Sequence, residues 1–189
     1  MEIVELSEAN WPALEALFGD NGAVAGCWCM WFRLPSKEFQ ASAYEPNRRA
    51  LRELAKSGEP VGLLGMEGDQ PVGWVAVAPR AVYRRLERST VAKPVDPRED
   101  LSGVWSVTCF YIHRTARRAG VSASLLTEAV RFASDRGARI VEGYPVDTHG
   151  AKMNSGELYH GTLSNFLAAG FRLVEARGPR RALVRKEIS

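Results

Sequence analysis

The chain has 189 residues, of which 46% are hydrophobic and 25% charged, and its formal net charge at pH 7 is +3. This length and apolar content can bury one good core, so we expect residues 1–189 to form a single domain. No apolar run approaches the roughly 18 residues that span a bilayer, the acidic N-terminus is unlike a signal peptide, and three cysteines make no disulfide framework; we therefore expect no membrane span and a reducing cytoplasm.

Positive charge is unevenly distributed along the chain. Residues 79–98 and 172–186 each carry six Lys or Arg, against two acidic residues and one acidic residue respectively. A basic surface of this kind can steer a polyanionic cofactor or bind nucleic acid. Because such charge most often belongs to a solvated face, we do not expect nucleic-acid binding.

The first half of the chain predicts a strand, two helices and a hairpin. Residues 2–6 alternate as a strand does, and residues 7–17 have the apolar spacing of a helix. Residues 47–56 predict a second helix. Two apolar runs, 61–66 and 71–78, flank a short turn rich in glycine and aspartate, which is typical of a β-hairpin.

Residues 26–35, between the two helices, are dense in large apolar and sulfur-bearing side chains. Cys27 and Cys29 stand one residue apart, but zinc prefers four ligands and usually a second pair, so we expect no metal site. Core packing is the more common role of such residues.

The second half of the chain predicts alternating strands and helices after a long connection. Residues 79–103 contain three prolines and many charges, with a short helix expected at residues 83–88. Beyond them the apolar pattern predicts, in chain order, a strand at 104–112, a helix at 120–136, a strand at 139–146, a loop at 148–157, a helix at 159–169, and strands at 171–176 and 182–187.

The stretch 110–123 predicts an anion site. A buried strand leads into a short basic loop, and a helix then begins near Gly120. The first N–H groups of a helix are unpaired and carry about half a positive charge, so they bind phosphate readily. Arg114, Arg117 and Arg118 add further charge. The alternative is an ordinary strand–turn–helix whose arginines are merely solvated.

Two motifs in this half resemble those of a known family. Arg117-Arg118-Ala119-Gly120-Val121-Ser122 resembles the Q/R-x-x-G-x-G/A signature of the GNAT (Gcn5-related) N-acetyltransferase superfamily. Ser122 stands where glycine or alanine is usual, but it is small and keeps its N–H. Phe166-Leu167-Ala168-Ala169-Gly170-Phe171 resembles the second landmark of that family, a helix ending in Gly-Phe before a strand. The resemblance implies the α/β (α+β) GNAT fold, a central mixed, mostly antiparallel twisted sheet with one parallel, splayed strand pair and helices on both faces.

The same resemblance implies an acetyl-CoA-dependent N-acetyltransferase that moves the acetyl group to the amine of a small molecule or peptide by direct transfer in a ternary complex. Acetyl-CoA is then the acyl-donor co-substrate, and the family also allows a homodimer. Strand backbone would pair with the pantetheine arm, and the loop would wrap the pyrophosphate. The implied cofactor-binding residues are Phe110, Tyr111, Ile112, Arg117, Arg118, Ala119, Gly120, Val121, Ser122 and Ala123.

The sequence departs from the family at two catalytic positions. Ser106 stands where histone-acetylating members carry a glutamate base, and Phe166 stands where a tyrosine acid is frequent. Glu142, on the strand beside the cofactor, is our alternative base, and Tyr144, on the same face of a regular strand, is our alternative acid. The competing interpretation is a salt bridge for Glu142 and simple packing for Tyr144.

In the GNAT architecture the segment between the first two helices overlies the acceptor. Trp28 and Trp31 could then form aromatic walls and Arg33 a carboxylate-binding fork, with core packing as the alternative. A different class of function is also open, a GNAT-shaped module that binds acyl-CoA or another ligand with little catalysis. Phe166, which has no proton to give, favours that alternative.

Overall fold

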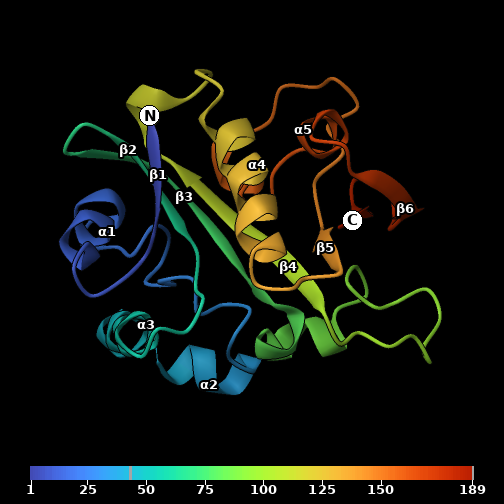
Figure 1. Ribbon diagram of the computed structural model, residues 1–189, viewed down its shortest axis with the longest axis horizontal. Helices are drawn as coiled ribbons and strands as arrows, with labels where there is room; N and C mark the ends of the chain where they lie inside the picture. Colours follow the sequence, from blue (N-terminus) through green and yellow to red (C-terminus); the bar gives the residue numbers. More distant parts are fainter. Residues whose placement is uncertain (43, 189) are drawn as a thin grey trace.

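The computed structural model describes residues 1–42 and 44–188, and the strands in these ranges form one seven-stranded sheet (Figure 1). The order across the sheet is β1-β2-β3-β4-β5-β7-β6. Neighbouring strands are antiparallel except for β4 and β5, which run parallel. The strands are β1 (Glu2–Glu5), β2 (Leu63–Glu67), β3 (Gln70–Pro79), β4 (Val104–Ile112), β5 (Ile140–Gly143), β6 (Arg172–Ala176) and β7 (Ala182–Glu187). The mixed, mostly antiparallel sheet with one parallel pair is therefore confirmed.

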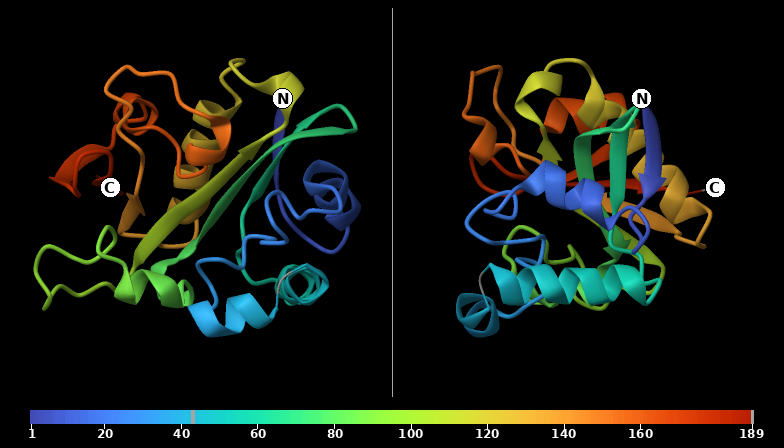
Figure 2. Two further views of the ribbon diagram at one scale, coloured as in Figure 1. Left: turned by 180° about the vertical axis from the view of Figure 1, so that it is seen from behind. Right: turned by 90° about the vertical axis from the view of Figure 1, so that its left-hand side faces the viewer.

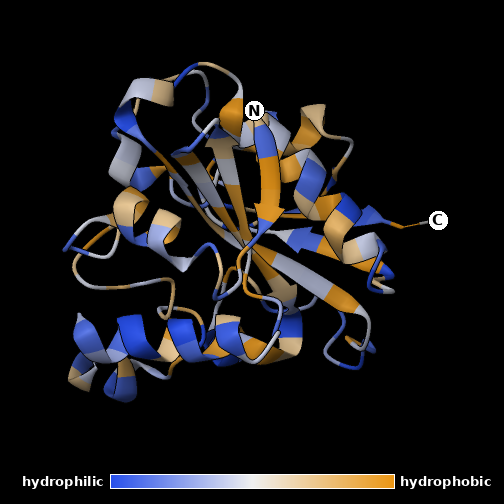
Figure 3. Cartoon of the chain, turned by 60° about the vertical axis from the view of Figure 1, so that its left-hand side comes forward, coloured by the Kyte–Doolittle hydropathy of each residue, from blue (hydrophilic) through white to orange (hydrophobic). Residues whose placement is uncertain are grey.

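Helices cover both faces of this sheet (Figures 1 and 2). The helices are α1 (Trp11–Phe18), α2 (Ser36–Ala41), α3 (Glu45–Lys56), α4 (Val121–Ser134) and α5 (Leu163–Ala168). Residues of α4 and α5 share one apolar cluster with β3, β4 and β5, whereas residues of α1 and α3 share another with β2 and β3. Apolar residues follow the central strands, and hydrophilic residues gather on the outer helices (Figure 3). None of the helices in the described ranges is long and apolar enough to cross a bilayer.

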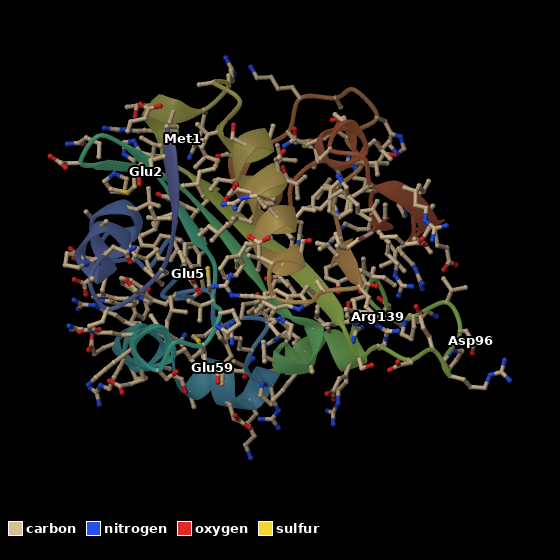
Figure 4. All side chains as sticks on the ribbon, in the orientation of Figure 1. Met1, Glu2, Glu5, Glu59, Asp96 and Arg139 are labelled. Atoms are coloured by element: carbon tan, nitrogen blue, oxygen red, sulfur yellow. The ribbon has the colours of Figure 1, made fainter. Side chains whose placement is uncertain are left out.

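The 3-10 turns Arg80–Val82 and Arg84–Arg88 follow β3, close to the predicted short helix. The remainder of this connection projects from the edge of the molecule, where Asp96 is labelled in Figure 4. Arg139, at the base of β5, donates to Asp100 across 2.8 Å. The long connection is thus held at its end against the start of the parallel strand pair.

A bulge interrupts β4 in its middle. Ala76 pairs with Cys109, but the next residue, Val77, pairs with Val107, so Thr108 is an extra residue in β4. Such a bulge bends a strand and changes which residues face each layer. β4 therefore bends at the level where its parallel neighbour ends.

Two helices begin later than the apolar spacing predicts. The helix expected at 7–17 begins at Trp11, because the side chain of Asn10 accepts from the Ser7 N–H and donates to the Glu5 carbonyl, each across 2.8 Å, which holds residues 7–10 in a turn. The helix expected at 159–169 begins at Leu163, after Thr162 as N-cap. The sequence pattern does not predict the short α2, since none of its residues is buried and it carries no apolar stripe.

The strand expected at 139–146 ends at Gly143. Pro145 has no N–H to donate to a ladder, and Val146 makes only isolated bridges, to Thr162 and Arg181. The parallel pairing of β4 and β5 is consequently short, with Val107 and Gly143 as its last partners.

Candidate active site

The loop between β4 and α4 leaves the helix N-terminus open. Gly120 is the N-cap residue with φ +77°, a left-handed conformation that glycine adopts without strain, and no side chain caps the helix. Among the described residues the N–H groups of Val121 and Ser122 have no acceptor, whereas the Ala123 N–H donates to the Gly120 carbonyl across 3.0 Å. Residues 117–120 are exposed. The loop therefore presents unpaired donors to solvent, as the sequence predicts.

Charge and shape at this N-terminus suit a diphosphate. Arg114, Arg117 and Arg118 are exposed, and none of them has a carboxylate within 4.0 Å among the described residues. The Ser122 hydroxyl accepts from the Asn165 side chain across 3.0 Å, which ties the start of α4 to α5. Serine at this position is thus accommodated, and the residues present fit a phosphate ligand.

The parallel pairing of β4 and β5 ends at Val107 and Gly143, and we call the region beside the unpaired edge of β4 beyond this point the slot. β4 continues for five residues beyond Val107, whereas β5 ends at Gly143. Along the free edge of β4, backbone groups alternate between the two sides of the strand. The His113 N–H donates to the Val72 carbonyl on β3, so the backbone groups of Phe110 and Ile112 face the slot.

This alternation corrects the expectation for Tyr111. Its backbone groups face Trp74 of β3, and they are not directed into the slot. The Tyr111 ring packs at 5.5 Å from the Phe18 ring, on the side of the sheet covered by α1. Tyr111 can therefore contribute to this region only through its side chain.

The chain itself occupies the slot at Phe110. The Phe110 N–H donates to the Tyr159 carbonyl across 2.6 Å, and the His160 Nδ1 lies 3.1 Å from the Thr108 carbonyl. Gly161 has φ +76°, and a Cβ there would lie 2.9 Å from the Phe166 ring and 3.1 Å from the Phe110 ring, so the position favours glycine. Of the backbone predicted to pair with pantetheine, the Phe110 amide is already bonded.

The His160 ring is neutral in this setting. Burial, followed by the charge of Arg181, lowers the pKa of His160 to about 3. A neutral ring that bonds a carbonyl oxygen through Nδ1 carries its hydrogen there and its lone pair at Nε2. The ring packs 4.0 Å from the Tyr159 ring and 5.5 Å from the Phe32 ring.

Glu142 lies at the centre of a buried ion-pair network. The carboxylate is fully buried and accepts from the Arg80 Nε at 3.2 Å and from the Arg185 Nε at 2.7 Å. Arg185 also donates to Glu99 across 3.0 Å. This is the salt bridge of the competing interpretation, with two arginines in place of one.

The Tyr144 hydroxyl belongs to the same network. It donates to Glu142 across 2.6 Å and lies 2.9 Å from the Ser106 hydroxyl. Burial, followed by the charge of Glu142, raises the pKa of Tyr144 well above its ordinary value. Phe166 is fully buried, with its ring centre 6.1 Å from that of Phe110. The structure thus brings Glu142, Tyr144 and Ser106 together, but in an enclosed position.

The three predicted acceptor residues lie in different surroundings. Trp28 is only 3% exposed and stacks on Trp11, although its edge borders a hollow of about 290 Å³ between α1 and α3. Arg33 is 8% exposed, donates to the Pro60 carbonyl across 3.0 Å and lies over the Tyr83 ring. Trp31, at 40% exposed, is the one of the three at the surface. The structure does not bring them together as one pocket.

The cysteines are packed side chains in this structure. Burial raises the pKa of the Cys27 thiol to about 11, and the Cys29 sulfur accepts from the Trp74 indole across 3.1 Å. Within residues 1–42 and 44–188, no group of three His, Cys, Asp or Glu side chains could hold a metal ion.

Sequence reasoning missed the segment that fills the slot and two arginines near it, Arg85 and Arg181. Gly161-Thr162 was the available signal, because a glycine inside a helix is unfavourable and Thr followed three residues later by Asn165 suits an N-cap. Nothing in the sequence singles out the two arginines from the other basic residues.

Within the described residues, the parallel strand pair separates beside a basic loop and an open helix N-terminus, an arrangement that suits a ligand bearing phosphate groups. The sequence model of the acetyltransferase (GNAT) family matches residues 28–153. Since this covers well over half of the chain, the protein belongs to the GNAT acetyltransferase family, whose acyl donor is acetyl-CoA. No curated protein sequence matches the chain significantly.

Solved structures of acetyltransferases share the fold. Ribosomal-protein-alanine N-acetyltransferase from Brucella melitensis aligns over 100% of both chains with a TM-score of 0.55 and 19% identity. The paia N-acetyltransferase from Thermoplasma acidophilum, solved in complex with coenzyme A, aligns over 99% of this chain and 98% of its own, with a TM-score of 0.53 and 14% identity. Aminoglycoside 6'-acetyltransferase type Ii aligns over 99% and 97%, with a TM-score of 0.57 and 12% identity. At these identities the likeness concerns the fold.

Proposed function

We propose that this protein transfers the acetyl group of acetyl-CoA to the amine of a small molecule or peptide, by direct attack in a ternary complex, and that residues 1–189 do so as one domain. The open N-terminus of α4 carries the proposal. Its unpaired N–H groups, the left-handed Gly120 and the exposed arginines Arg117 and Arg118 form a phosphate cradle at the mouth of the slot. The thioester would lie farther along the slot, toward Phe110.

Within this proposal Glu142 and Tyr144 are the assigned base and acid. Both side chains are buried and two arginines bind Glu142, which also suits a role in stabilising the fold. Most of the rate enhancement would then come from the positioning of the amine against the thioester. Backbone N–H groups along the slot are suited to polarise a thioester carbonyl, because such donors are fixed before the reaction begins.

The test has two stages. Acetyl-CoA binding is measured by calorimetry, and thiol release from acetyl-CoA is then followed with a panel of primary amines that includes aminoglycosides, polyamines, amino acids and peptide N-termini. We expect binding, and thiol release with at least one class of amine. Absence of acetyl-CoA binding by the folded protein would refute the proposal.

A GNAT-shaped binding module with little catalysis is the second candidate. It is favoured by Phe166, which offers no hydroxyl at a frequent acid position, and by the hydrogen bond that engages the Phe110 amide. Binding of acetyl-CoA without thiol release beyond the hydrolysis rate, across the whole panel, would support this candidate over the enzyme.

The compartment and the assembly are also proposals. All three cysteines are free thiols, which is consistent with the reducing cytoplasm that we propose. A homodimer is testable by sedimentation, where a single species of 20.8 kDa would contradict it.

A further inference from the structure

Four of the buried or half-buried arginines differ in their partners. Arg80 and Arg185 are both paired with Glu142, and Arg185 also with Glu99. Arg85 and Arg181 have no carboxylate within 4.0 Å in residues 1–42 and 44–188, although parts of both guanidinium groups are closed off from solvent. Closing a guanidinium N–H off from water without a hydrogen-bond partner is costly, so Arg85 and Arg181 need an explanation.

Arg85 is held in place but only partly bonded. Its guanidinium lies 3.8 Å above the centre of the Trp31 ring, and its Nη1 donates to the Ser36 hydroxyl across 3.0 Å. The Nε and Nη2 atoms are buried and have no hydrogen-bond partner among the residues that the structure describes. These two atoms form one edge of the guanidinium, the edge that commonly binds a carboxylate through two parallel hydrogen bonds.

Arg181 likewise has a donor nitrogen that is not bonded. Its Nη2 donates to the Tyr144 carbonyl across 2.8 Å, whereas its Nε is buried and has no partner within the described part of the chain. Backbone contacts place both arginines beside the segment that fills the slot. Arg181 forms a bridge with Val146, whose N–H donates to the Gly161 carbonyl across 2.9 Å. The Arg85 N–H donates to the Phe32 carbonyl, and the Phe32 ring lies 5.5 Å from the His160 ring.

Both arginines therefore lie near residues 159–161, which cross the slot at Phe110. The Tyr159 carbonyl accepts from the Phe110 N–H, at the place where the thioester is proposed to lie. Coenzyme A phosphates belong elsewhere under our proposal, at the exposed start of α4, where Arg117 and Arg118 stand. The anion that would satisfy Arg85 and Arg181 is accordingly a group on the acceptor.

We propose that Arg85 and Arg181 bind the carboxylate of the acceptor, so that the acceptor is an amino acid or another amine that bears a carboxylate. This inference rests on the proposed function. It moves the carboxylate-binding role from Arg33, whose Nη2 is bonded to the Pro60 carbonyl, to two arginines that retain unbonded donors. Because these donors are closed off, neighbouring side chains must move to admit the ligand. Tyr159 belongs to the segment that acetyl-CoA would displace from Phe110.

The test compares matched acceptors and matched variants. Thiol release from acetyl-CoA is measured with the twenty L-amino acids and with the corresponding amino acid amides, which keep the amine and side chain but lack the carboxylate. The same series is run with Arg85→Gln and Arg181→Gln, and with the controls Arg84→Gln and Arg180→Gln, which alter exposed neighbours. Acetyl-CoA affinity and urea unfolding are recorded for every variant. Arg85→Lys is added because it keeps the positive charge but lacks the two parallel N–H donors of the guanidinium.

We expect at least one acid to be a better substrate than its amide by about tenfold or more, the usual effect of a charge-assisted hydrogen bond. Arg85→Gln and Arg181→Gln should raise the KM for the acid by about tenfold and leave the amide unchanged, whereas both controls behave as the parent. If the protein binds acetyl-CoA but acetylates the amides as well as the acids, or acetylates no acid, this inference is overturned and the proposed function is not. Failure to bind acetyl-CoA overturns the proposed function as well.

Discussion

The main-chain N–H of Phe110 donates to the carbonyl oxygen of Tyr159 across 2.6 Å, from the free edge of β4 to the segment that precedes α5. This bond uses a donor that we expect, under the proposed function, to pair with the pantetheine arm of acetyl-CoA. If acetyl-CoA pairs with β4 at this residue, the bond to Tyr159 must break and be replaced by one to the cofactor. Binding and movement of residues 158–162 are then linked.

Hydrogen–deuterium exchange should reveal that linkage. With saturating acetyl-CoA, we expect slower exchange in residues 118–124 and faster exchange in residues 158–162, because the latter lose their bonds to β4. The nucleotide half of coenzyme A, without pantetheine, should slow the first segment and leave the second unchanged. Unchanged exchange at 158–162 with the complete cofactor would mean that pantetheine does not replace Tyr159.

Gly120→Glu should abolish tight acetyl-CoA binding. Gly120 and Gly137 flank the two ends of α4 with φ of +77° and +78°, and a Cβ added at either position would have no atom within 4 Å. Glutamate costs about 1 kcal/mol of stability at either site because of the left-handed backbone. Only at Gly120 does the new carboxylate oppose the phosphate, so we expect affinity to fall by about tenfold or more by calorimetry.

Gly137→Glu is the matched control for that experiment. It should lose similar stability and retain the parent affinity for acetyl-CoA. Equal affinity in the two variants would remove the loop before α4 from the binding site.

Glu142→Gln should destabilise the fold by about 3 kcal/mol or more, because Arg80 and Arg185 would lose their shared anion in a buried position. Urea unfolding measures the loss, and Glu187→Gln, which breaks an exposed pair with Arg172, should cost about 0.5 kcal/mol at most. Parent-like stability of Glu142→Gln would contradict the structural interpretation of this network.

The catalytic assignment of the same network is tested by turnover. Under the assignment of Glu142 as base and Tyr144 as acid, Glu142→Gln and Tyr144→Phe lower turnover without weakening acetyl-CoA binding. Turnover is measured at a temperature at which each variant is folded. If turnover is unchanged, both assignments are wrong and positioning of the substrates is the main contribution to the rate.

Stability should decline in mild acid because of His160. Its pKa is about 3 in the fold, against 6.5 for an unperturbed histidine. Below pH 6.5 the unfolded chain takes up a proton that the folded chain does not, so this contribution is complete above pH 6.5 and is lost as the pH falls toward 3. Between pH 7 and pH 5 we expect a loss of about 2 kcal/mol.

Urea unfolding at the two pH values measures this loss. His160→Gln should remove the contribution and flatten the profile, whereas His149→Gln, at an exposed site, should follow the parent. Identical slopes for the parent and His160→Gln would show that His160 is accessible to protons in the folded state.

Local patterns are enough for much of the fold. The strand predicted at residues 104–112 forms β4 with those bounds, and the hairpin of β2 and β3 and the start of α4 lie where the apolar spacing and Gly120 place them. These features depend on residues that are close together in the chain, so the composition and the apolar spacing are enough to predict them. The motif 117–122 likewise indicates the family without any knowledge of packing.

The interior of the site depends on residues that are distant in the chain. Glu142 meets Arg80 across 62 positions and Arg185 across 43, and no periodicity predicts which arginine reaches which carboxylate. Contacts between distant parts of the chain also explain why residues 158–162 fill the slot. They likewise explain why some donors of Arg85 and Arg181 have no partner in the described residues. By itself the sequence determined the order of the strands and of the longer helices, and the glycine-initiated start of α4, because these features are local. Tertiary structure alone decided which charges are paired, because pairing follows from where the packed sheet brings the side chains.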